Sequence, residues 1–398
     1  MATEGGPAIV EDGLVLALDA ANTKSFRGEP TTNYATVDLG NWSVEGSASR
    51  IATNSTFRGQ PVYKARSQVG SVWIAINETI SGLRTAAGAS GTVTFSIFVK
   101  NPNNTAYTVS AYIGHDFSSG RSIPANSDWQ RIQWTVNQSS MNNDYVEFRP
   151  YTNNADIYLE FTMPQVEVNV GTATRFATGT RGTTVATGGG WADISGNDNH
   201  GEILNGTSTS NDGSVLGALQ FDGTNDEVRL NGVGVSSWAD PFTMEVWINI
   251  PTGAVWDGGT DRLSTIFANL GGYSGTYGLV KWGNNEGRIG FYLRGDNGGI
   301  STYGEGFSRD TWHHLVGTWD GTNTNFYGNG QLVSGPAGSA RTGVPDTTNL
   351  TLGLARAFSG STGAYFEGLM ANAKYYYKAL SAKEVLQNYN ATKGRFGL

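Results

Sequence analysis

Short runs of alternating apolar and polar residues constrain the fold of this chain more than any other feature. Apolar side chains occupy every second position in residues 93–99, 157–163 and 242–250. This period of two is that of a β-strand with one buried face. Clusters of Gly, Asn, Asp and Ser separate the runs, which is typical of antiparallel β-sandwiches and not of βα units. The sequence therefore predicts an all-β fold.

Two local motifs refine this prediction. Asn329 and Gly330 stand between strand-like flanks and both tolerate positive φ, so we expect a two-residue hairpin turn there. Ser381 lies three residues before Glu384, which is the spacing of a helix capping box. Apolar residues follow at helical spacing, and Gly394 closes the segment. We expect one short C-terminal helix.

Composition excludes several classes of function. The chain has 398 residues, 15% of them charged, a net charge of -8 and no cysteine. Its basic residues are scattered, whereas nucleic acid and anionic lipid both require a positive cluster. The absence of cysteine excludes disulfides and thiolate metal sites. The first residues lack the pattern of a signal peptide, and no apolar run is long enough to span a membrane. We expect no nucleic-acid partner, no membrane partner and release by cell lysis.

Five segments of the C-terminal half follow one another in a recognisable order: 191–201, 218–228, 242–248, 311–321 followed by the Asn-Gly hairpin, and 366–381. On these segments the C-terminal half resembles the laminin-G-like, concanavalin-A-like lectin superfamily. The resemblance implies a two-sheet jelly roll. Residues 13–22 look like the first strand of the same family, where that strand normally runs almost directly into the opening loop.

About 150 residues separate that strand from the loop, so we predict a second domain inserted into the first. The insert resembles a β-sandwich of the carbohydrate-binding-module type, on residues 94–100, 128–131, 163–167 and 174–176. The fold class we predict is all-β, with two β-sandwich (jelly-roll) domains, one inserted in the other. The predicted parts are a first lectin strand in 1–29, the insert in 30–178, a Gly/Thr-rich linker in 179–190 and the jelly roll in 191–398.

Candidate ligand-contacting residues are aromatic side chains expected in loops, because a sugar ring packs against a flat aromatic face. The candidates for carbohydrate binding are Trp42, Tyr273, Tyr277, Trp282 and Tyr303. The loop 193–199 is rich in oxygen donors and raises the alternative of a calcium site, although such side chains more often hold their own turn. We otherwise expect no cofactor and no metal site.

Catalytic and metal-binding interpretations of the remaining residues are weaker. His313 and His314 are neighbours in a predicted strand, so they point to opposite faces and cannot chelate one ion. We expect one of them to pack inside and the other to face outward. Isolated carboxylates such as Glu245 and Glu367 are expected to be solvated, and glycoside hydrolysis needs a pair. We therefore predict that the chain is not an enzyme.

Three hypotheses of function remain. Residues 14–22 and 388–396 resemble phage structural proteins. The first hypothesis is a fibre, appendage or decoration protein located on a phage virion, which binds host-surface or environmental glycans. Its expected partners are glycans, other virion proteins and further copies of itself, as a homo-oligomer. The second is a purely architectural virion protein whose modules mediate subunit contacts, and the third is an accessory binding chain of a polysaccharide-degrading system.

Overall fold

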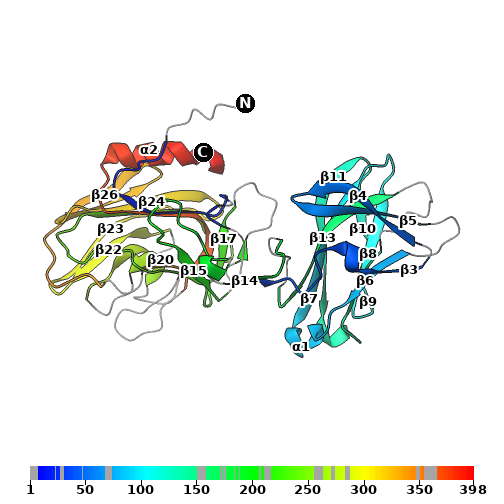
Figure 1. The fold of residues 1–398 in the computed structure, drawn as a ribbon. Coiled ribbons are helices and arrows are strands. Elements are labelled where there is room, and N and C mark those ends of the chain that lie inside the picture. The colour runs from blue at the N-terminus through cyan, green and yellow to red at the C-terminus, as the bar shows by residue number, and fades with distance from the viewer. Residues whose placement is uncertain are drawn as a thin grey trace. The chain divides into compact units, whose positions relative to one another are not determined.

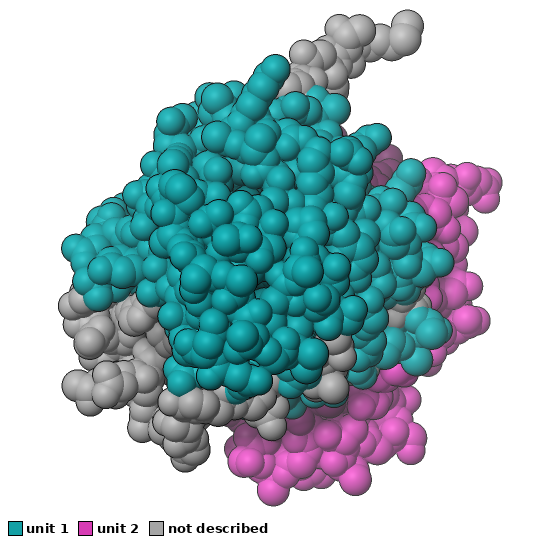
Figure 2. Space-filling model, turned by 90° about the vertical axis from the view of Figure 1, so that its left-hand side faces the viewer, with its two compact units in different colours: residues 1–30, 182–398 teal, residues 31–181 magenta. Residues whose placement is uncertain are grey.

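In the computed structural model the chain forms two compact units, one from residues 1–30 with 182–398 and the other from residues 31–181 (Figures 1 and 2). We call them unit 1 and unit 2. The corresponding divisions predicted from the sequence lie at residues 30, 178 and 191. The structure describes residues 8–22, 24–26, 31–46, 48–67, 74–149, 158–170, 173, 176–182, 184–187, 189–205, 208–209, 217–254, 263–269, 274–282, 287–346, 350–353 and 365–398.

Unit 1 is a sandwich of two antiparallel sheets. The first, sheet A, has the order β16-β17-β28-β19-β24-β25-β26, and β1 also pairs with β28. Its strands are β1 (Leu14–Asp19), β16 (Ser208–Thr209), β17 (Leu219–Asp222), β19 (Phe242–Asn249), β24 (Trp312–Trp319), β25 (Asn323–Gly328), β26 (Gln331–Gly338) and β28 (Glu367–Tyr376). The pairing of β1 with β28 adds the first strand to a sheet whose other strands all come from the C-terminal half.

The second sheet, sheet B, has the order β15-β18-β27-β20-β21-β22-β23. Its strands are β15 (Gly201–Leu204), β18 (Glu227–Leu230), β20 (Leu263–Asn269), β21 (Tyr277–Trp282), β22 (Ile289–Gly295), β23 (Gly298–Gly304) and β27 (Leu350–Leu352). The alternating apolar residues of both sheets form one core between them. Gly317 of β24 has no space for a side chain, because Phe291 of sheet B fills that position; a Cβ there would lie 2.2 Å from its ring. The predicted all-β, jelly-roll class is confirmed.

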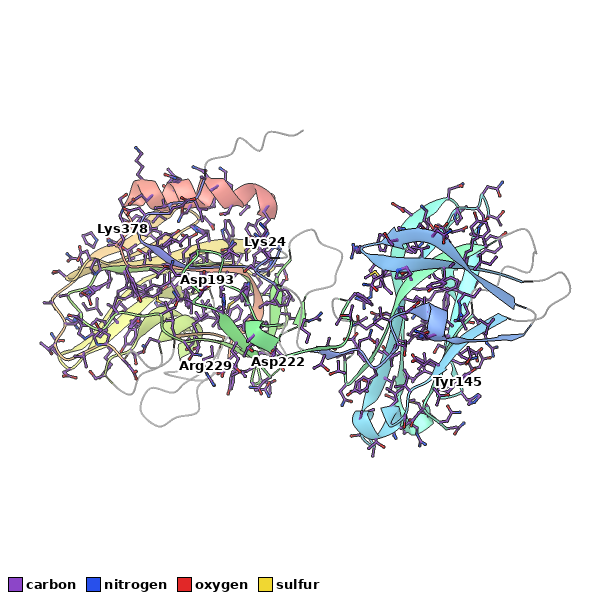
Figure 3. The ribbon with its side chains drawn as sticks, in the orientation of Figure 1. Lys24, Tyr145, Asp193, Asp222, Arg229 and Lys378 are labelled. Atoms are coloured by element: carbon purple, nitrogen blue, oxygen red, sulfur yellow. The ribbon has the colours of Figure 1, made fainter. Side chains whose placement is uncertain are left out.

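A helix, α2 (Ala382–Thr392), covers the outer face of sheet A (Figure 1). Ser381 and Glu384 form the predicted capping box, with each side chain bonded to the backbone of the other residue. A short 3₁₀ turn (Lys393–Phe396) continues the helix, and the Phe396 ring stacks on Trp247 of β19 with centroids 4.1 Å apart. Lys378, labelled in Figure 3, contacts Glu384 of α2 at 2.6 Å. Of the described helices, none is long and apolar enough to cross a membrane.

The predicted turn at Asn329 and Gly330 is also confirmed. Both residues have positive φ, 50° and 77°, and the flanking residues Gly328 and Gln331 are paired across the hairpin of β25 and β26. These values are those of the turn type that matches the twist of the strands it joins.

Unit 2 is a second antiparallel sandwich. One sheet has the order β10-β8-β12-β6-β3 with β9 paired to β8, and the other has the order β11-β7-β13-β5-β4. The first contains β3 (Ser43–Gly46), β6 (Ile74–Thr79), β8 (Tyr107–Ile113), β9 (Asp116–Phe117), β10 (Arg121–Ile123) and β12 (Tyr145–Arg149). The second contains β4 (Ala48–Phe57), β5 (Gln60–Ser67), β7 (Thr92–Asn101), β11 (Ser127–Asn137) and β13 (Leu159–Val168). Unit 2 has its own apolar core and short helical turns at η1 (Leu39–Asn41), α1 (Leu83–Ala87) and η2 (Gln138–Ser140).

The chain enters and leaves unit 2 at adjacent positions. β2 (Thr31–Thr32) pairs antiparallel with β14 (Thr180–Arg181), and Thr31 lies opposite Arg181. Within unit 1, Phe26 and Trp191 form a bridge, so the two sides of the interruption lie next to one another there as well. The predicted linker 179–190 contains β14 and a short turn, η3 (Val185–Thr187).

Candidate functional site

Two of the aromatic residues predicted to contact a sugar lie inside the sandwiches. Trp42 is 2% exposed in the core of unit 2, where its indole N–H donates to the Thr36 carbonyl at 2.8 Å. Tyr277 is fully buried in the core of unit 1, and burial raises the pKa of its hydroxyl to about 12. Neither ring offers a face to solvent, so we no longer count these two residues as ligand contacts. Both residues were expected in loops, whereas Tyr277 is the first residue of β21 and Trp42 directly precedes β3.

Of the other three candidates, the structure describes the side chain of Tyr303 alone. Tyr273 lies outside the described residues, and Trp282 is described only as the last residue of β21. Tyr303 of β23 is 42% exposed, and the Arg288 guanidinium lies 4.5 Å from its ring centroid. Its ring is thus exposed to solvent and already partly covered by a cation. Its role as a sugar contact stays a prediction.

The oxygen-rich loop 193–199 uses its central carboxylate to hold its own backbone. Asp193 (labelled in Figure 3) accepts bonds from the Ala17 and Ser195 N–H groups through Oδ1, at 2.8 and 2.9 Å. Its Oδ2 accepts from the Ser195 hydroxyl at 2.8 Å and the Asn199 N–H at 3.0 Å. Three of these bonds lie within the loop, and the bond from Ala17 fastens the loop to β1. Within the described residues, no group of three or more His, Asp or Glu side chains is arranged to hold a metal ion.

Both histidines of the predicted pair are buried, which corrects the expectation that one of them faces outward. His313 lies on the inner face of sheet A, and its Nε2 is 2.9 Å from the Ser308 carbonyl oxygen. His314 points to the outer face, but α2 covers that face and the side chain is fully buried. Its Nε2 lies 3.1 Å from the carboxylate of Glu245, which the sequence analysis expected to be solvated.

An open hollow of about 410 Å³ lies at one end of unit 1, and we call it the Tyr377 hollow. Its lining residues are Gly234, Val235, Ser236, Asp240, Pro241 and Tyr377. Tyr377 directly follows β28 and is 45% exposed, while its hydroxyl donates to the Gly234 carbonyl at 3.1 Å. This hydrogen bond holds an aromatic ring at the protein surface in one orientation.

The loop of residues 231–241 is anchored from beneath, and this makes the hollow a preformed site. Val233, Val235 and Trp238 are each 3% exposed and join the core of unit 1. The Val235 N–H donates to the buried Tyr277 hydroxyl at 3.4 Å. The predicted contact residue Tyr277 thus supports the loop from the core. Pockets that are already formed bind with a smaller cost in conformational entropy.

The chemistry of the Tyr377 hollow combines an apolar ring surface with hydrogen-bonding groups. The Tyr377 ring packs edge-on against Tyr375, with centroids 5.8 Å apart, so the core fixes its tilt. Asp240 and Ser236 are exposed in the same lining and supply a carboxylate and a hydroxyl. The lining therefore offers one flat apolar surface, one anionic acceptor and one hydroxyl. Sequence reasoning missed it because Tyr377 and the loop lie 143 residues apart in the chain, measured from Gly234.

One comparison with known protein families covers the segment that contains this hollow. Residues 222–386 match the model of the concanavalin A-like lectin/glucanases superfamily, and this range contains every residue that lines the Tyr377 hollow. No curated protein matches the chain.

Similar solved structures include two toxin domains. The binding domain of botulinum neurotoxin serotype C1 is 15% identical with a TM-score of 0.39, over 50% of this chain and 49% of that one. The binding domain of serotype D is 16% identical with a TM-score of 0.38, over 51% of this chain and 48% of that one. The chain thus spans about half the length of these structures.

Proposed function

We propose that this chain is a glycan-binding protein and that its lectin-like unit binds a saccharide in the Tyr377 hollow. The observation that carries the proposal is the exposed Tyr377 ring beside the Asp240 carboxylate, inside the segment that matches a lectin superfamily. A sugar has one face of C–H groups and a rim of hydroxyls. The ring suits the C–H face, and the carboxylate accepts bonds from the hydroxyls.

The same lining supports binding without hydrolysis. Glycosidases position a pair of carboxyl groups about 5 to 10 Å apart on either side of the scissile bond. Asp240 is the single carboxylate among the described residues that line the hollow. The proposed activity is therefore reversible recognition of a glycan.

The biological setting that we propose is the surface of a phage virion, where the chain would serve as a fibre, appendage or decoration protein. The resemblance of residues 14–22 and 388–396 to phage structural proteins supports it. So does the low charged fraction of 15%, since a surface of neutral hydrogen-bonding groups suits an outward-facing protein. The proposed partners are host-surface or environmental glycans, other virion proteins and further copies of this chain.

One observation favours a second, architectural function. β26 is an edge strand of sheet A, and it exposes Leu332 and Val333 by 49% and 43%. Exposed apolar residues on an unpaired edge favour association with another chain. In this alternative, unit 1 contributes subunit contacts to an assembly and the Tyr377 hollow carries no ligand.

A glycan array with the full-length protein separates the two functions. We expect the wild type to bind a subset of glycans, and Tyr377→Ala to lose at least about tenfold in affinity for them, because it removes the ring surface. Asp240→Asn should weaken binding less, since the amide still accepts a hydrogen bond. Tyr303→Ala removes the other exposed tyrosine described in unit 1 and tests the remaining contact predicted from the sequence, and a site at the Tyr377 hollow predicts that it leaves binding unchanged.

The array is repeated with calcium and with a chelator. We expect glycan binding to be the same in calcium and in chelator, because four hydrogen bonds already occupy the Asp193 carboxylate. Loss of binding in Tyr303→Ala with retention in Tyr377→Ala would move the site to β23. A folded protein that binds no glycan would reject the proposal in favour of the architectural function.

A further inference from the structure

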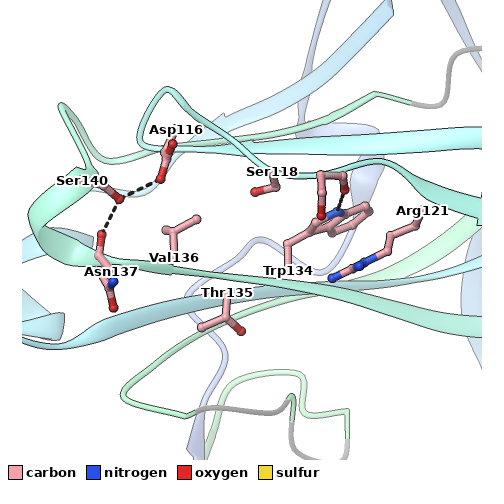
Figure 4. A pocket seen from close by; sticks show the side chains of 9 residues that line it. Asp116, Ser118, Arg121, Trp134, Thr135, Val136, Asn137 and Ser140 are labelled. Carbon is pink, nitrogen blue, oxygen red and sulfur yellow. Dashed lines mark hydrogen bonds between the residues drawn. The ribbon is translucent and has the colours of Figure 1, made fainter.

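Unit 2 contains a second hollow, at a position where the edges of its two sheets face one another (Figure 4). Its volume is about 400 Å³. One wall comes from β9, β10 and the residues between them, and the opposite wall comes from β11 and the turn after it. We call it the edge hollow, and its lining residues are Asp116, Ser118, Ser119, Arg121, Trp134, Thr135, Val136, Asn137 and Ser140.

Three polar residues of the first wall occupy positions that face the inside of the sandwich. Asp116 lies opposite Ile113, Arg121 lies opposite Val109, and the Ser118 N–H donates to the Ala111 carbonyl. The three partners on β8 are fully buried core residues. Because side chains directly opposite one another share a face of the sheet, Asp116, Ser118 and Arg121 lie on the same face as these partners. Ser118 is buried there, Asp116 is half-buried, and Arg121 is exposed at the rim of the hollow.

A bulge sets the spacing of these residues. Three steps along the chain separate Ser118 from Arg121, whereas two steps separate their neighbours Ala111 and Val109, so one residue is extra. Gly120 makes this possible, because a Cβ at that position would lie 2.5 Å from the Thr108 side chain. Bulges often redirect side chains next to binding sites.

Hydrogen bonds join the two walls at both ends of the edge hollow. At one end the Trp134 indole donates to the Ser119 carbonyl at 2.8 Å, and the Arg121 Nε donates to the Gln133 carbonyl at 3.3 Å. At the other end the Ser140 hydroxyl donates to Asp116 Oδ2 at 2.7 Å. Figure 4 shows the space that remains between these ends, with Ser118 and Val136 beside it. These bonds fix the spacing of the two walls of the open hollow.

The unpartnered hydroxyl of Ser118 is the observation that favours a bound ligand. Its side chain lines the hollow and the residue is 7% exposed, yet its hydroxyl has no hydrogen-bond partner among the described residues. Buried polar groups are nearly always hydrogen-bonded, because the loss of water is otherwise uncompensated. Inward charges on an edge strand can also serve to prevent aggregation, which would account for Arg121. That role needs no buried, unpartnered hydroxyl.

Charge favours an anionic ligand. Residues 31–181 carry 11 basic and 10 acidic side chains, a net charge of +1, so the rest of the chain, with 15 basic and 24 acidic side chains, carries -9 of the total of -8. At the edge hollow, both terminal nitrogens of the Arg121 guanidinium are without partners among the described residues. A guanidinium presents two parallel N–H groups that match a carboxylate. Asp116 Oδ1, likewise unbonded in the described part of the chain, is an acceptor for hydroxyl groups.

We propose that the edge hollow binds one acidic sugar unit, a ring that carries both a carboxylate and hydroxyl groups. The carboxylate pairs with Arg121, and the ring hydroxyls bond to Asp116 and Ser118. This site is separate from the Tyr377 hollow and takes a different ligand class, so it does not depend on the function proposed for unit 1.

Ligand-observed saturation-transfer NMR with the full-length protein tests this site. The probes are glucuronate, galacturonate and N-acetylneuraminate, each compared with its methyl ester, which keeps the ring and removes the charge. We expect at least one acid to bind more tightly than its ester, with a dissociation constant in the millimolar range. Arg121→Gln should weaken binding of the acid by roughly tenfold and abolish the difference from the ester. Arg121→Lys should restore only part of it, because lysine lacks the planar fork.

Three further variants separate a binding site from a structural one. Arg58→Gln removes an exposed arginine of unit 2 outside the hollow and should leave acid binding unchanged. Ser118→Ala should weaken the binding of acid and ester alike, while the melting temperature stays equal or rises, because an unpartnered hydroxyl is removed. Tyr377→Ala should leave acid binding intact.

The proposal is overturned if no acid gives saturation transfer at ~10 mM with folded protein. It is also overturned if acid and ester bind equally, or if Arg58→Gln loses as much binding as Arg121→Gln. The last result would show that unit 2 attracts anions through its general charge.

Discussion

At the scale of single residues, burial decides the ionisation of Asp226. This residue lies between β17 and β18 and is 3% exposed. Its Oδ2 accepts the Asp222 N–H at 2.9 Å. Burial, together with a smaller effect of the nearby Asp222 carboxylate, outweighs that hydrogen bond and raises the pKa of the Asp226 carboxyl group to about 6. At neutral pH the folded chain therefore holds a poorly solvated negative charge.

The raised pKa of Asp226 predicts a pH-dependent stability. In the unfolded chain an aspartate titrates near pH 4, so between about pH 4 and pH 6 the folded state binds more protons than the unfolded state. The free energy of unfolding should fall as pH rises through this window. Asp226→Asn should remove that fall and stabilise the protein at pH 7 by roughly 1–3 kcal/mol.

Urea unfolding curves at several pH values between 4 and 8 measure this effect. Asp128→Asn is the control, because the Asp128 side chain is 88% exposed. Curves for Asp226→Asn that run parallel to the wild type across the window would show that Asp226 is not the group responsible.

At the scale of elements, a buried polar network fastens α2 to sheet A. Glu245 is fully buried, its Oε1 lies 2.5 Å from Lys374 Nζ and 3.1 Å from His314 Nε2, and its Oε2 accepts from Asn388 Nδ2 at 2.6 Å. Asn388 Oδ1 also accepts the Val10 N–H at 2.7 Å. Burial by itself raises the pKa of Glu245, but the charges of Lys374 and His314 outweigh it and hold the pKa well below its usual range.

We predict that Asn388 stabilises the attachment of α2 more than the helix cap does. Asn388→Ala leaves one oxygen of a buried carboxylate and one backbone N–H without partners, which should cost about 2–4 kcal/mol of unfolding free energy. Ser381→Ala removes the capping box at the exposed end of the same helix and should cost about 1 kcal/mol. Chemical denaturation measures both, and equal losses would show that the network contributes no more than a surface cap.

The same elements show what the sequence could predict. The capping box of Ser381 and the turn at Asn329 follow from local chemistry, and both were predicted correctly. Glu245 was expected in solvent, because the alternation of β19 shows two faces and does not show that a helix more than a hundred residues later covers one of them. The two hollows were not predicted, for a similar reason. The Tyr377 hollow joins segments that are distant in sequence, and the edge hollow depends on a strand register that only the folded chain reveals.

At the scale of the whole molecule, unit 2 interrupts unit 1 between two positions that are already neighbours. Phe26 and Trp191 form a bridge, the Ala192 N–H donates to the Ser25 carbonyl at 2.6 Å, and the Ser25 hydroxyl donates to the Ala192 carbonyl at 2.5 Å. Residues bridged in this way have Cα atoms about 5 Å apart, a gap that a short hairpin loop spans. Each unit also has its own apolar core.

We therefore predict that unit 1 folds without unit 2 when residues 27–190 are replaced by a four-residue Gly/Ser loop. Removing a long insertion costs little, because the entropy of closing a loop changes slowly with its length. The shortened protein should unfold in one cooperative transition and keep the glycan binding of the Tyr377 hollow, while the acid binding of the edge hollow disappears with unit 2. Calorimetry and the two binding assays measure these outcomes. A shortened chain that fails to fold would mean that unit 1 needs contacts from residues 27–190. A folded one that still binds acidic sugars would place that site in unit 1.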